Sequence, residues 1–577
     1  MFGSASRDDC SGRWISMTPD EAAAHLVRTD PRFEVTETVI RGVRYRVFRN
    51  APPHLRGLLQ QARSVYDGGD VLVYRDERWS YSRFCSEVCR VANALARDQG
   101  VRQGDRVAIA MRNFPELPIL ILAVNALGAV AVPMNAWWSE SELTYAIEDC
   151  GARIVFADGP RHVLIAPYAA RQGLQLFAVR DAEGECSYAE LRDGDAGEQW
   201  PEAAIDPDAD FAVLYSSGST DRPKGVVLTH RGAISTVYSW LLMRAMTPLV
   251  DGAVPPSGRP LSWLIATPLF HVTALHAVFL QGLVNGAKLS LLYKWDAEEA
   301  IRVIKAEQVT RFVGVPTQSM DLLEAAARLG ERLETLESIG AGGAKRPAVQ
   351  VAQLAKAFPQ AAVSTGWGMT ETNSLGITLG GPEYLSNPGT AGRLQPPLQD
   401  MRIVDPDGNP LPPGEVGELL VKSPANMRCY LNQPEATAAT LQDGWLHTGD
   451  LARVEENGLI TIVDRMKSII IRGGENIACL DVEDALHQHP AVAEACAFPV
   501  PDERLGEIVG AAVQPKADSL LTGRELVDFL SERVARFKIP ERIWFRDQPL
   551  PRGGTDKLDR RAVRTECLER KPMWKAR

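Results

Sequence analysis

The chain has 577 residues, of which 45% are hydrophobic and 24% charged, and its formal net charge is −10. This composition is typical of a globular protein, and the length is too great for one hydrophobic core, so we expect two to four domains. The negative charge argues against a nucleic acid as the main partner. Nine cysteines without a Cys-x-x-Cys pair indicate a reducing compartment and argue against a structural zinc site.

Neither a secretory signal nor a membrane span is predicted. The N-terminus lacks the charged, apolar and cleavage regions of a signal peptide. The most apolar stretch, residues 117–134, contains Pro118, Asn125 and Gly128, which divide it into a buried helix and a short buried strand. We therefore expect a cytoplasmic protein with no transmembrane segment.

Strand and helix patterns alternate along most of the chain. Residues 1–55 form a polar extension to which no role is assigned. From residue 56 the rhythm is typical of stacked α/β layers with largely parallel sheets. Near residue 395 it changes to short strands and Pro/Gly turns, and a compact α+β pattern begins at about 465. The predicted fold class is α/β, with a large domain over 56–465, a small β subdomain within it over 395–450, and a small α+β domain over 466–577.

The loop "YSSGSTDRPKG" (215–225) follows the strand pattern "FAVLY" and precedes a stretch with helical spacing. It should therefore lie at the carboxyl end of a strand in an α/β unit, where ligands commonly bind. Its glycine, its hydroxyl groups and Lys224 suit a polyphosphate. It is not a Walker A loop, because Lys224 precedes Gly225 and Val226 follows. A polar surface loop is the alternative interpretation.

The segment "GWGMTET" (366–372) combines an aromatic ring with a carboxylate. Trp367, between two glycines, offers a platform for a flat base. Glu371 fits Mg²⁺, which takes one or two carboxylates together with phosphate oxygens.

Three later motifs complete the set. Asp450, in "WLHTGDLARV", follows an expected tight turn and is suited to accept both ribose hydroxyls. The stretch 464–477 combines a basic turn with a Gly-Gly bend. Lys557, in "PRGGTDKLDR", lies within residues 541–577, which hold eleven Lys or Arg against six Asp or Glu. A solvated basic surface is the alternative unless a phosphate binds nearby.

In this order and spacing, the motifs resemble those of the adenylate-forming superfamily, which comprises acyl-CoA synthetases, adenylation domains and firefly-type luciferases. The resemblance covers roughly residues 55–570 and is greatest to synthetases of fatty or other hydrophobic acids. One motif would be weak evidence, whereas five in order are specific. The resemblance implies ATP, Mg²⁺ and coenzyme A as ligands, and a C-terminal domain that swings between two poses.

The resemblance also implies roles for individual residues. The catalytic residues would be Lys557, Thr370, Glu371 and His271. The ATP site would comprise Ser216, Ser217, Gly218, Ser219, Thr220, Lys224, Gly342, Gly343, Ala344, Gly366, Trp367, Gly368, Met369, Thr370, Asp450, Arg465 and Lys557. The metal would be held by Glu371 and Thr220, and CoA by Gly473, Gly474 and Glu475. The hinge would be Lys467, and the acyl pocket would include His271, Val272 and Gly342.

The implied reaction has two steps. The substrate carboxylate attacks the α-phosphorus of ATP to give acyl-AMP and pyrophosphate, and a thiol then displaces AMP. Lys557 would bridge the carboxylate and the α-phosphate in the first step, where fixed cations stabilise the developing charge.

The chain departs from the pattern of the superfamily at four positions. Asp221 and Asp556 stand where glycine is usual, and each brings a carboxylate near the ATP phosphates and removes a residue free to adopt positive φ. We expect a reduced ATP affinity or rate from these two. Ala478 and Cys479 replace an aromatic–proline pair, which weakens the expectation of a standard thiol tunnel.

The segment 266–283 resembles the acyl-pocket strand and helix of fatty and aryl acyl-CoA synthetases, with His271 at the pocket mouth. A packed helix-cap histidine is the alternative for His271. The segment 237–246 is bulky and apolar, and we expect no Lys or Arg near the pocket to pair a second carboxylate. The expected substrate is therefore a hydrophobic monocarboxylic acid, of open chain length and ring type.

The acceptor has alternatives. Coenzyme A is favoured by the standalone architecture and the Gly-Gly motif. The phosphopantetheine thiol of a carrier protein is the second hypothesis, and a nucleotide-binding homologue with impaired catalysis is the third. A homodimer is left open.

Overall fold

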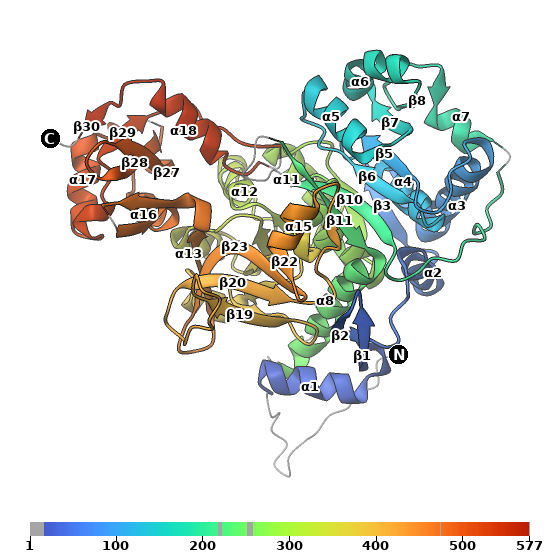
Figure 1. The fold of residues 1–577 in the computed structure, drawn as a ribbon, viewed down its shortest axis with the longest axis horizontal. Helices are drawn as coiled ribbons and strands as arrows, with labels where there is room; N and C mark the ends of the chain where they lie inside the picture. The colour runs from blue at the N-terminus through green and yellow to red at the C-terminus, as the bar shows by residue number, and fades with distance from the viewer. Residues whose placement is uncertain are drawn as a thin grey trace, which may run out of the picture.

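The computed structural model describes residues 17–194, 196–216, 222–250, 258–473, 475–517, 519–554 and 556–575. Within these residues the chain forms an eight-stranded, a nine-stranded and a five-stranded sheet, followed by a six-stranded sheet near the C-terminus. Figure 1 shows the last of these in a separate lobe on the left, beside the rest of the molecule. This arrangement confirms the predicted α/β class with a large N-terminal and a smaller C-terminal domain.

The eight-stranded sheet has a parallel centre. Its order is β21-β11-β10-β6-β5-β7-β8-β9, and all neighbours from β10 to β9 pair in parallel. Its strands are β5 (Arg106–Ala110), β6 (Val130–Pro133), β7 (Ile154–Asp158), β8 (Gln175–Val179), β9 (Cys186–Ser187), β10 (Asp210–Ser216), β11 (Lys224–Thr229) and β21 (Cys429–Tyr430). The helices between them are α3 (Tyr81–Asp98), α4 (Glu116–Ala126), α5 (Glu140–Cys150), α6 (Gly159–Gln172) and α7 (Tyr188–Asp193).

The apolar stretch at 117–134 divides as expected. It forms α4, which is buried at every position, and the buried strand β6. Asn125 within α4 donates its side-chain N–H to the Phe211 carbonyl oxygen at 2.7 Å, so its amide nitrogen is paired inside the core. No helix of the described residues is long and apolar enough to cross a membrane.

The sequence indicated helical spacing directly after the serine-rich loop, but the structure begins this segment with a strand. Lys224–Thr229 is the strand β11, which pairs antiparallel with β10 and on its other side with β21. Val226, Val227 and Leu228 are fully buried there, so pairing on both sides decides the conformation of an apolar run that suits either period. Helix α8 (His230–Val250) begins only afterwards.

The nine-stranded sheet has the order β18-β17-β16-β15-β14-β12-β13-β3-β4. From β16 to β3 its neighbours pair in parallel. Its strands are β3 (Asp70–Tyr74), β4 (Glu77–Ser80), β12 (Ser262–Ile265), β13 (Lys288–Leu291), β14 (Arg311–Gly314), β15 (Ser338–Gly342), β16 (Ala362–Trp367), β17 (Ile377–Gly380) and β18 (Arg393–Leu394). Its helices are α2 (Leu55–Tyr66), α9 (Val272–Ala274), α10 (Gln281–Asn285), α11 (Ala297–Ala306), α12 (Pro316–Leu329), α13 (Ala348–Ala357) and α14 (Gly381–Ser386).

The five-stranded sheet leads into the C-terminal domain. Its last strand ends at Arg465, the short 3₁₀ turn η4 (Met466–Ser468) follows, and Ile469 begins a strand of the next sheet. The strands before this turn are β19 (Asp400–Val404), β20 (Gly417–Lys422), β22 (Leu441–Gln442), β23 (Trp445–Val454) and β24 (Ile460–Arg465), with helix α15 (Pro434–Thr440).

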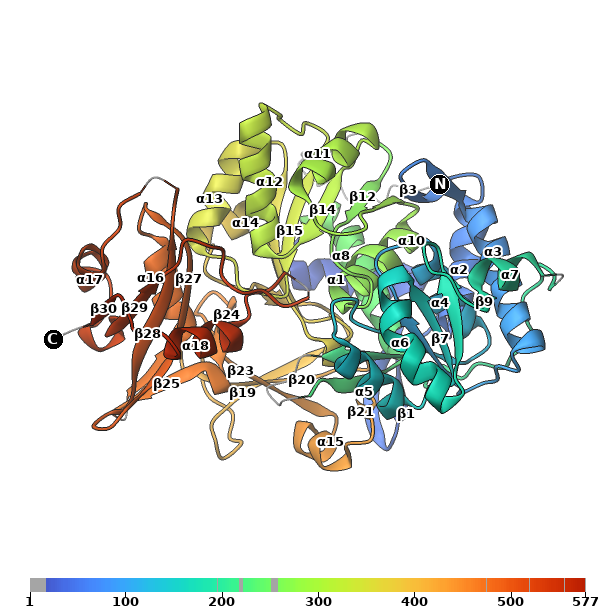
Figure 2. The same ribbon diagram turned by 90° about the horizontal axis from the view of Figure 1, so that it is seen from above.

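The C-terminal domain has a core of its own. Buried side chains from its strands and helices, such as Ile470, Val482, Val509 and Leu530, form a separate hydrophobic cluster. Its elements are β25 (Ile469–Arg472), β26 (Glu475–Ala478), α16 (Cys479–His487), β27 (Val492–Asp502), β28 (Gly506–Pro515), α17 (Gly523–Ser531), β29 (Arg542–Phe545), α18 (Arg560–Leu568) and β30 (Trp574–Lys575). Helices α12 and α13 of the large domain lie beside it in both ribbon views (Figures 1 and 2).

The described part of the N-terminal extension packs on the large domain. Helix α1 (Pro19–Thr29) contacts α8, and the hairpin of β1 (Val35–Ile40) and β2 (Val43–Phe48) places Phe48 in the core. The sequence assigned no role to this segment, and the structure makes it a cover for α8.

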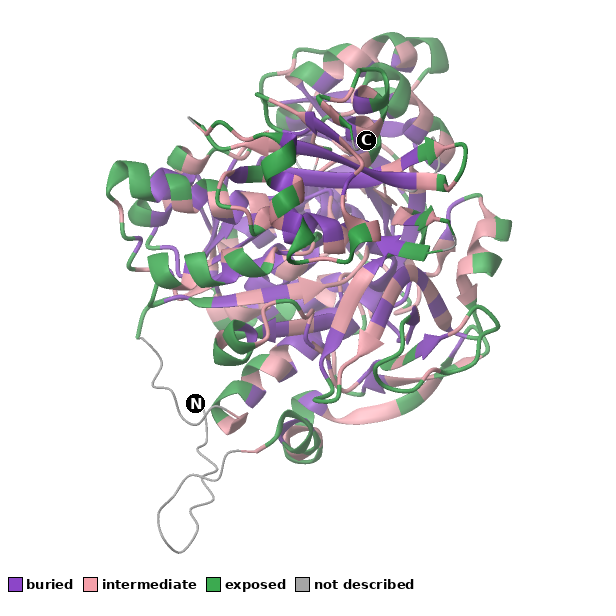
Figure 3. Cartoon of the chain, turned by 90° about the vertical axis from the view of Figure 1, so that its left-hand side faces the viewer, coloured by how far each residue is buried: buried purple, intermediate pink, exposed green. Residues whose placement is uncertain are grey.

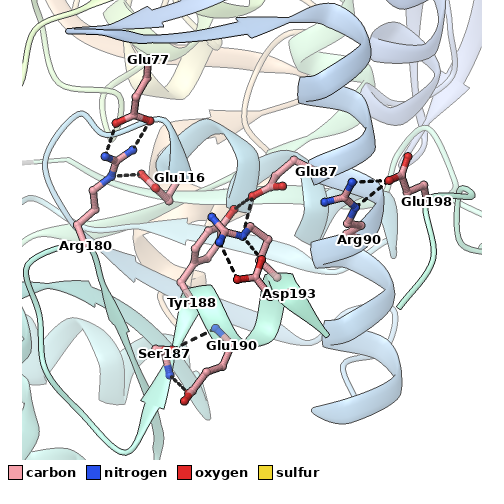
Figure 4. A network of polar contacts seen from close by, with 11 residues as sticks. Glu77, Glu87, Arg90, Glu116, Arg180, Ser187, Tyr188, Glu190, Asp193 and Glu198 are labelled. Carbon is pink, nitrogen blue, oxygen red and sulfur yellow. Dashed lines mark hydrogen bonds and ion pairs between the residues drawn. The ribbon is translucent and has the colours of Figure 1, made fainter. Parts of the chain in front are cut away.

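Buried residues concentrate in the sheets, with exposed residues on the outer helices (Figure 3). One polar network links the two large sheets at their flank (Figure 4). Arg180, just after β8, contacts Glu77 on β4 at 2.5 Å and Glu116 at the start of α4 at 2.8 Å. The network thus ties an edge of the nine-stranded sheet to a loop of the eight-stranded one.

Candidate functional site

Strands β15 and β16 end side by side, in parallel, at the edge where ligands of α/β sheets usually bind. Gly342, the last residue of β15, pairs with Gly366, the last residue but one of β16, and neither has a side chain to fill the space between them. Trp367 follows, and the 3₁₀ turn η3 (Thr370–Thr372) then presents Thr370 and Glu371, which are only 8% and 7% exposed.

Lys557 of the C-terminal domain reaches this edge. A Cβ atom at Gly343 would come within 2.5 Å of Lys557 Cε and 2.8 Å of its Nζ, so the lysine lies directly against the glycine backbone. Gly343 has φ +79°, which also favours glycine. Lys557 Nζ lies 3.4 Å from His271 Nε2. The structure therefore joins residues that are more than 200 positions apart in the sequence.

The geometry of His271 assigns its tautomer. Nδ1 accepts a hydrogen bond from the Thr273 backbone N–H at 3.2 Å, which caps α9. Burial and the nearby Lys557 lower the pKa of His271 well below its ordinary value, so the ring is neutral and its proton sits on Nε2. His271 is therefore both a helix cap and a donor that points toward Lys557, and the two interpretations from the sequence are compatible.

Two charged neighbours act on Lys557. Burial and then the repulsion of Arg465 lower the pKa of Lys557 to about 8, while Glu371 acts in the opposite direction. Lys557, Arg465 and Glu371 therefore belong to one electrostatic cluster. A cluster with two cations and one carboxylate beside the backbone of Gly343 suits an anionic ligand.

The carboxylate of Glu371 is held by Tyr430, whose hydroxyl donates to Oε1 at 2.9 Å. Lys224 Nζ lies 4.9 Å from the centre of the Tyr430 ring, a cation–π contact. Tyr430 thus connects Glu371 with the β10–β11 hairpin, where Lys224 pairs with Ser216.

Asp450 lies within strand β23 and not after a tight turn. The turn signal of Gly449, which has φ +69°, is a bulge in β23, because the three residues between His447 and Leu451 face the single residue Leu419 on β20. Asp450 is 3% exposed; Trp367 Nε1 donates to its Oδ2 at 2.8 Å, and Arg465 Nε lies 3.2 Å from its Oδ1. Burial raises the pKa of Asp450, and these two donors oppose the rise.

The structure does not join every predicted residue to this cluster, because some lie outside its described part. Ser217, Gly218, Ser219, Thr220, Asp221 and Gly474 lie outside the described residues. Gly473 follows β25 and Glu475 begins β26, and the Gly473 N–H donates to the Leu505 carbonyl oxygen at 2.8 Å. Lys467 lies exposed on η4, in the connection between the two domains. Within the described part of the chain, no three His, Cys, Asp or Glu side chains gather as a metal site.

The sequence did not single out four residues that support the site. They are Tyr430, Gln318, Asn373 and His276. His276 lies in a π-helix (η2, Leu275–Leu280), and its Nε2 is 2.9 Å from Asn373 Oδ1. Short π-helical segments are frequent at functional sites. Each acts through a partner at least 50 positions away, and only the fold brings such pairs together.

Comparison with known proteins identifies the family of this chain. The sequence profile of the AMP-binding enzymes matches residues 59–431, and that of the AMP-binding enzyme C-terminal domain matches residues 481–557. A feruloyl-CoA synthase of Amycolatopsis is 35% identical over 87% of this chain and 95% of its own length. A 2-succinylbenzoate–CoA ligase of Bacillus cereus is 31% identical over 85% of this chain and 94% of its own.

Solved structures show the same fold. The o-succinylbenzoate-CoA synthetase of Bacillus subtilis, bound to its acyl-adenylate intermediate, superposes with a TM-score of 0.75 at 30% identity, and covers 89% of this chain and 98% of that one. The same enzyme with ATP and a magnesium ion gives a TM-score of 0.74 at 29% identity, with 88% and 99% covered. The chain therefore belongs to the adenylate-forming superfamily of AMP-binding enzymes, among the acid–thiol ligases.

Proposed function

We propose that the protein is an ATP-dependent acyl-CoA synthetase that activates a hydrophobic carboxylic acid as acyl-AMP, releases pyrophosphate and transfers the acyl group to coenzyme A. The contact of Lys557 with Gly343 and His271 carries the proposal, because it brings a cation of the C-terminal domain to the carboxyl ends of β15 and β16. Relatives crystallised with ATP and with an acyl-adenylate share this fold.

The nucleotide would lie across the ends of β15 and β16 and beside Asp450 within β23. Trp367 packs against adenine, Asp450 and Arg465 hold the ribose, and Ser216 and Lys224 belong to the loop that holds the outer phosphates. Asp450 is already oriented by Trp367 and Arg465, so its carboxylate is pre-organised to accept hydroxyls.

Glu371 fits a magnesium ion. It is a carboxylate that is 7% exposed, fixed by Tyr430 and close to the proposed phosphates, and Mg²⁺ takes few protein ligands when phosphate oxygens and waters supply the rest. When bound, the ion would neutralise phosphate charge. Thr370 would meet the α-phosphate, and Thr220 remains a predicted second contact.

The carboxylate of the acid would bind between His271 and Lys557. The His271 Nε2–H and a protonated Lys557 are both donors, and at 3.4 Å they face each other without an acceptor between them. A carboxylate oxygen placed beside both would accept from each. The two donors therefore mark the place of the reacting oxygen.

The first step then follows from charge. The carboxylate oxygen forms a bond to the α-phosphorus, the bond from that phosphorus to the pyrophosphate oxygen breaks, and pyrophosphate leaves. Lys557 and Arg465 stabilise the charge that develops on the transferring group. In the second step the thiol sulfur attacks the acyl carbon, the bond to the phosphate oxygen breaks, and AMP departs.

The second step would need another pose of the C-terminal domain. Gly473, in the β25–β26 turn, would contact coenzyme A, yet Lys557 of the same domain occupies the reacting edge in this structure. The turn at η4 would serve as the hinge, with Lys467 in its middle.

The proposed acid is a hydrophobic monocarboxylic acid. The buried side chains of α8, including Val237, Tyr238, Trp240 and Leu242, make this segment apolar, as a binding site for such an acid would require. The cation in this segment, Arg244, is exposed. The relatives described above are named for feruloyl and 2-succinylbenzoate, both of which contain a benzene ring, so acids with an aromatic ring stand first among the candidates.

The test is a panel of fatty, alicyclic and aryl acids incubated with the protein, ATP and Mg²⁺, with coenzyme A or a holo-carrier protein as acceptor. Pyrophosphate release with acyl-CoA as product is the expected result. Acylated carrier protein without acyl-CoA would establish the second hypothesis. ATP binding without pyrophosphate release for any acid would identify an impaired homologue.

A further inference from the structure

Asp556 connects the two domains at the residue before Lys557. Its Oδ2 accepts a hydrogen bond from Gln318 Nε2 at 3.1 Å, and Gln318 is on helix α12 of the large domain. The Asp556 carbonyl oxygen accepts from the Thr317 hydroxyl at 3.4 Å. Backbone and side chain of one residue therefore both contact the start of α12.

The loop that carries Asp556 is closed by its own hydrogen bonds. The Asp556 N–H donates to the Gly553 carbonyl oxygen at 3.0 Å, and the Gly553 N–H donates to that of Lys557 at 2.8 Å. Arg552 donates to the Asp556 carbonyl oxygen at 3.1 Å and pairs with Glu494 of β27. Because Asp556 and Lys557 belong to one closed loop, whatever fixes Asp556 also fixes Lys557.

Asp556 adopts the left-handed conformation, with φ +58°. Aspartate tolerates this conformation better than most residues, so an aspartate in place of the usual glycine adds little backbone strain here. Its carboxylate is engaged by a donor of the large domain. The carboxylate that was expected to reduce ATP affinity or rate therefore has a specific hydrogen-bond partner.

The surroundings of Gln318 fix its side-chain amide so that Nε2 faces Asp556. It is 1% exposed, and its Oε1 accepts from the Val315 N–H at 3.1 Å, which satisfies the N-terminus of α12. A Cβ at Gly314 would come within 2.5 Å of the same oxygen, so the amide lies tightly against the backbone. With Oε1 committed to Val315, the Nε2 group must point to Asp556.

We propose that Asp556 is a positioning residue that docks the Lys557 loop onto α12 and so favours the pose in which acyl-AMP forms. This inference rests on the proposed function, in which Lys557 serves the first half-reaction. The docked contact speeds adenylation, and it must break before the domain can swing to serve thioester formation. Asp556 therefore raises the rate of the first step, where the sequence led us to expect a lower rate.

The variants separate the hydrogen bond from charge and backbone. Asp556→Gly keeps positive φ available and removes the acceptor, so adenylation should slow by about tenfold, the size of a lost hydrogen bond to a charged group. Asp556→Asn tolerates the same conformation and retains an acceptor oxygen, so it should stay within about threefold of the unaltered protein. Gln318→Glu keeps the Val315 contact but places two carboxylates together, and it should be slow like Asp556→Gly.

The double variant Asp556→Asn with Gln318→Glu is the decisive member of the set. The asparagine amide can donate to the new glutamate, so the contact reforms with donor and acceptor exchanged. Adenylation should recover relative to Gln318→Glu alone. Asp547→Gly, which removes an exposed carboxylate of the same domain, is the matched control and should leave the rate unchanged.

Two readouts are needed. The rate of pyrophosphate release is measured beside the rate of thioester formation from supplied acyl-AMP, which should not fall in Asp556→Gly. Hydrogen exchange of peptides covering 315–320 and 551–559, without substrates, should rise in Asp556→Gly and Gln318→Glu and return in the double variant.

The exchange readout keeps this inference separate from the proposed function. If no acid supports pyrophosphate release, the proposed function fails while docking can still be seen by exchange. Equal exchange in all variants would overturn the docking contact. An Asp556→Asn variant as slow as Asp556→Gly, or a double variant that does not recover, would also overturn it, since charge and not the hydrogen bond would then matter.

Discussion

Lys557 should give adenylation a defined dependence on pH. Its pKa is lowered to about 8 by burial and by Arg465, and only the protonated amine can stabilise charge on the adenylyl group that is transferred. The value of kcat/KM for adenylation should therefore fall about tenfold for each pH unit above roughly 8. Lys557→Arg, which stays protonated, should show no such fall at whatever rate it retains. A profile that keeps rising beyond pH 9 would contradict the role of the protonated amine.

Tyr430 offers a second test at the scale of one residue. Its hydroxyl donates to Glu371, so Tyr430→Phe leaves that buried carboxylate without its fixed partner. Contacts that orient a metal ligand typically contribute about 10-fold or more to metal affinity or activity. We expect the Mg²⁺ concentration for half-maximal adenylation to rise by about that factor. A Mg²⁺ titration of the initial rate measures it.

The matched control for Tyr430 is Tyr384→Phe, on helix α14, whose hydroxyl is not bonded to Glu371. An unchanged Mg²⁺ dependence in Tyr430→Phe would show that Glu371 does not bind the metal, or that Tyr430 does not orient it.

Single residues could be predicted where the chemistry is local. Glu371, Asp450 and Lys557 each stand in a short motif, and the structure brings all three to one cluster. Tyr430 and Gln318 could not be predicted, because neither lies in a motif with its partner. A hydrogen bond between positions 371 and 430, or 318 and 556, is a property of the fold alone.

At the scale of elements, the ion pairs of Arg180 hold the two large sheets together. Arg180→Leu leaves Glu77 and Glu116 without their cation, and Glu116 has only 11% of its side chain exposed. We expect a lower Tm at pH 7, by about 2–4 °C for each kcal/mol lost. Arg302→Leu, which removes the exposed pair with Glu299, is the control and should change little.

The lowering of Tm in Arg180→Leu should become smaller as the pH falls. The hydrogen bond from Arg180 lowers the pKa of Glu77 below its ordinary value of 4.5. A lowered pKa contributes stability that is present above the unfolded value and is lost as the pH falls through the folded value. The difference in Tm between Arg180→Leu and the unaltered protein should hold from pH 7 to about 5 and shrink below 4.5. A difference that grows on acidification would contradict the assignment.

Elements with strong local signals could be predicted, and those decided by pairing could not. Helix α5 has a Ser139 cap and a C-terminal Gly151 at φ +64°, as its sequence indicates. Strand β11 was missed, since the apolar run that follows the loop 215–225 acquires its conformation only by pairing with β10 and β21. Asp450 was placed after a turn because a glycine inside a bulge carries the same signal as a turn.

At the scale of the molecule, the two half-reactions should separate at the hinge. Lys467 lies in the turn between β24 and β25, which belong to different sheets. Lys467→Pro fixes φ near −65° and removes a backbone donor, so the domain should lose its second pose. Pyrophosphate release in the first turnover should survive at least partly, while thioester formation should fall by at least about 100-fold, a barrier increase of some 2.7 kcal/mol. Lys467→Ala, which leaves the torsions free, should affect neither step strongly. A folded proline variant that forms thioester at a near-normal rate would move the hinge elsewhere.

The central claim is that Lys557 serves the first half-reaction and not the second. The measurement is a pair of single-turnover rates for Lys557→Ala: pyrophosphate release from ATP and an acid, and thioester formation from supplied acyl-AMP and coenzyme A. We predict a fall of at least about 10²–10³ in the first rate, the scale of one lost pre-organised donor, with the second nearly unchanged. Equal losses in both rates would contradict the account and reduce Lys557 to a structural lysine.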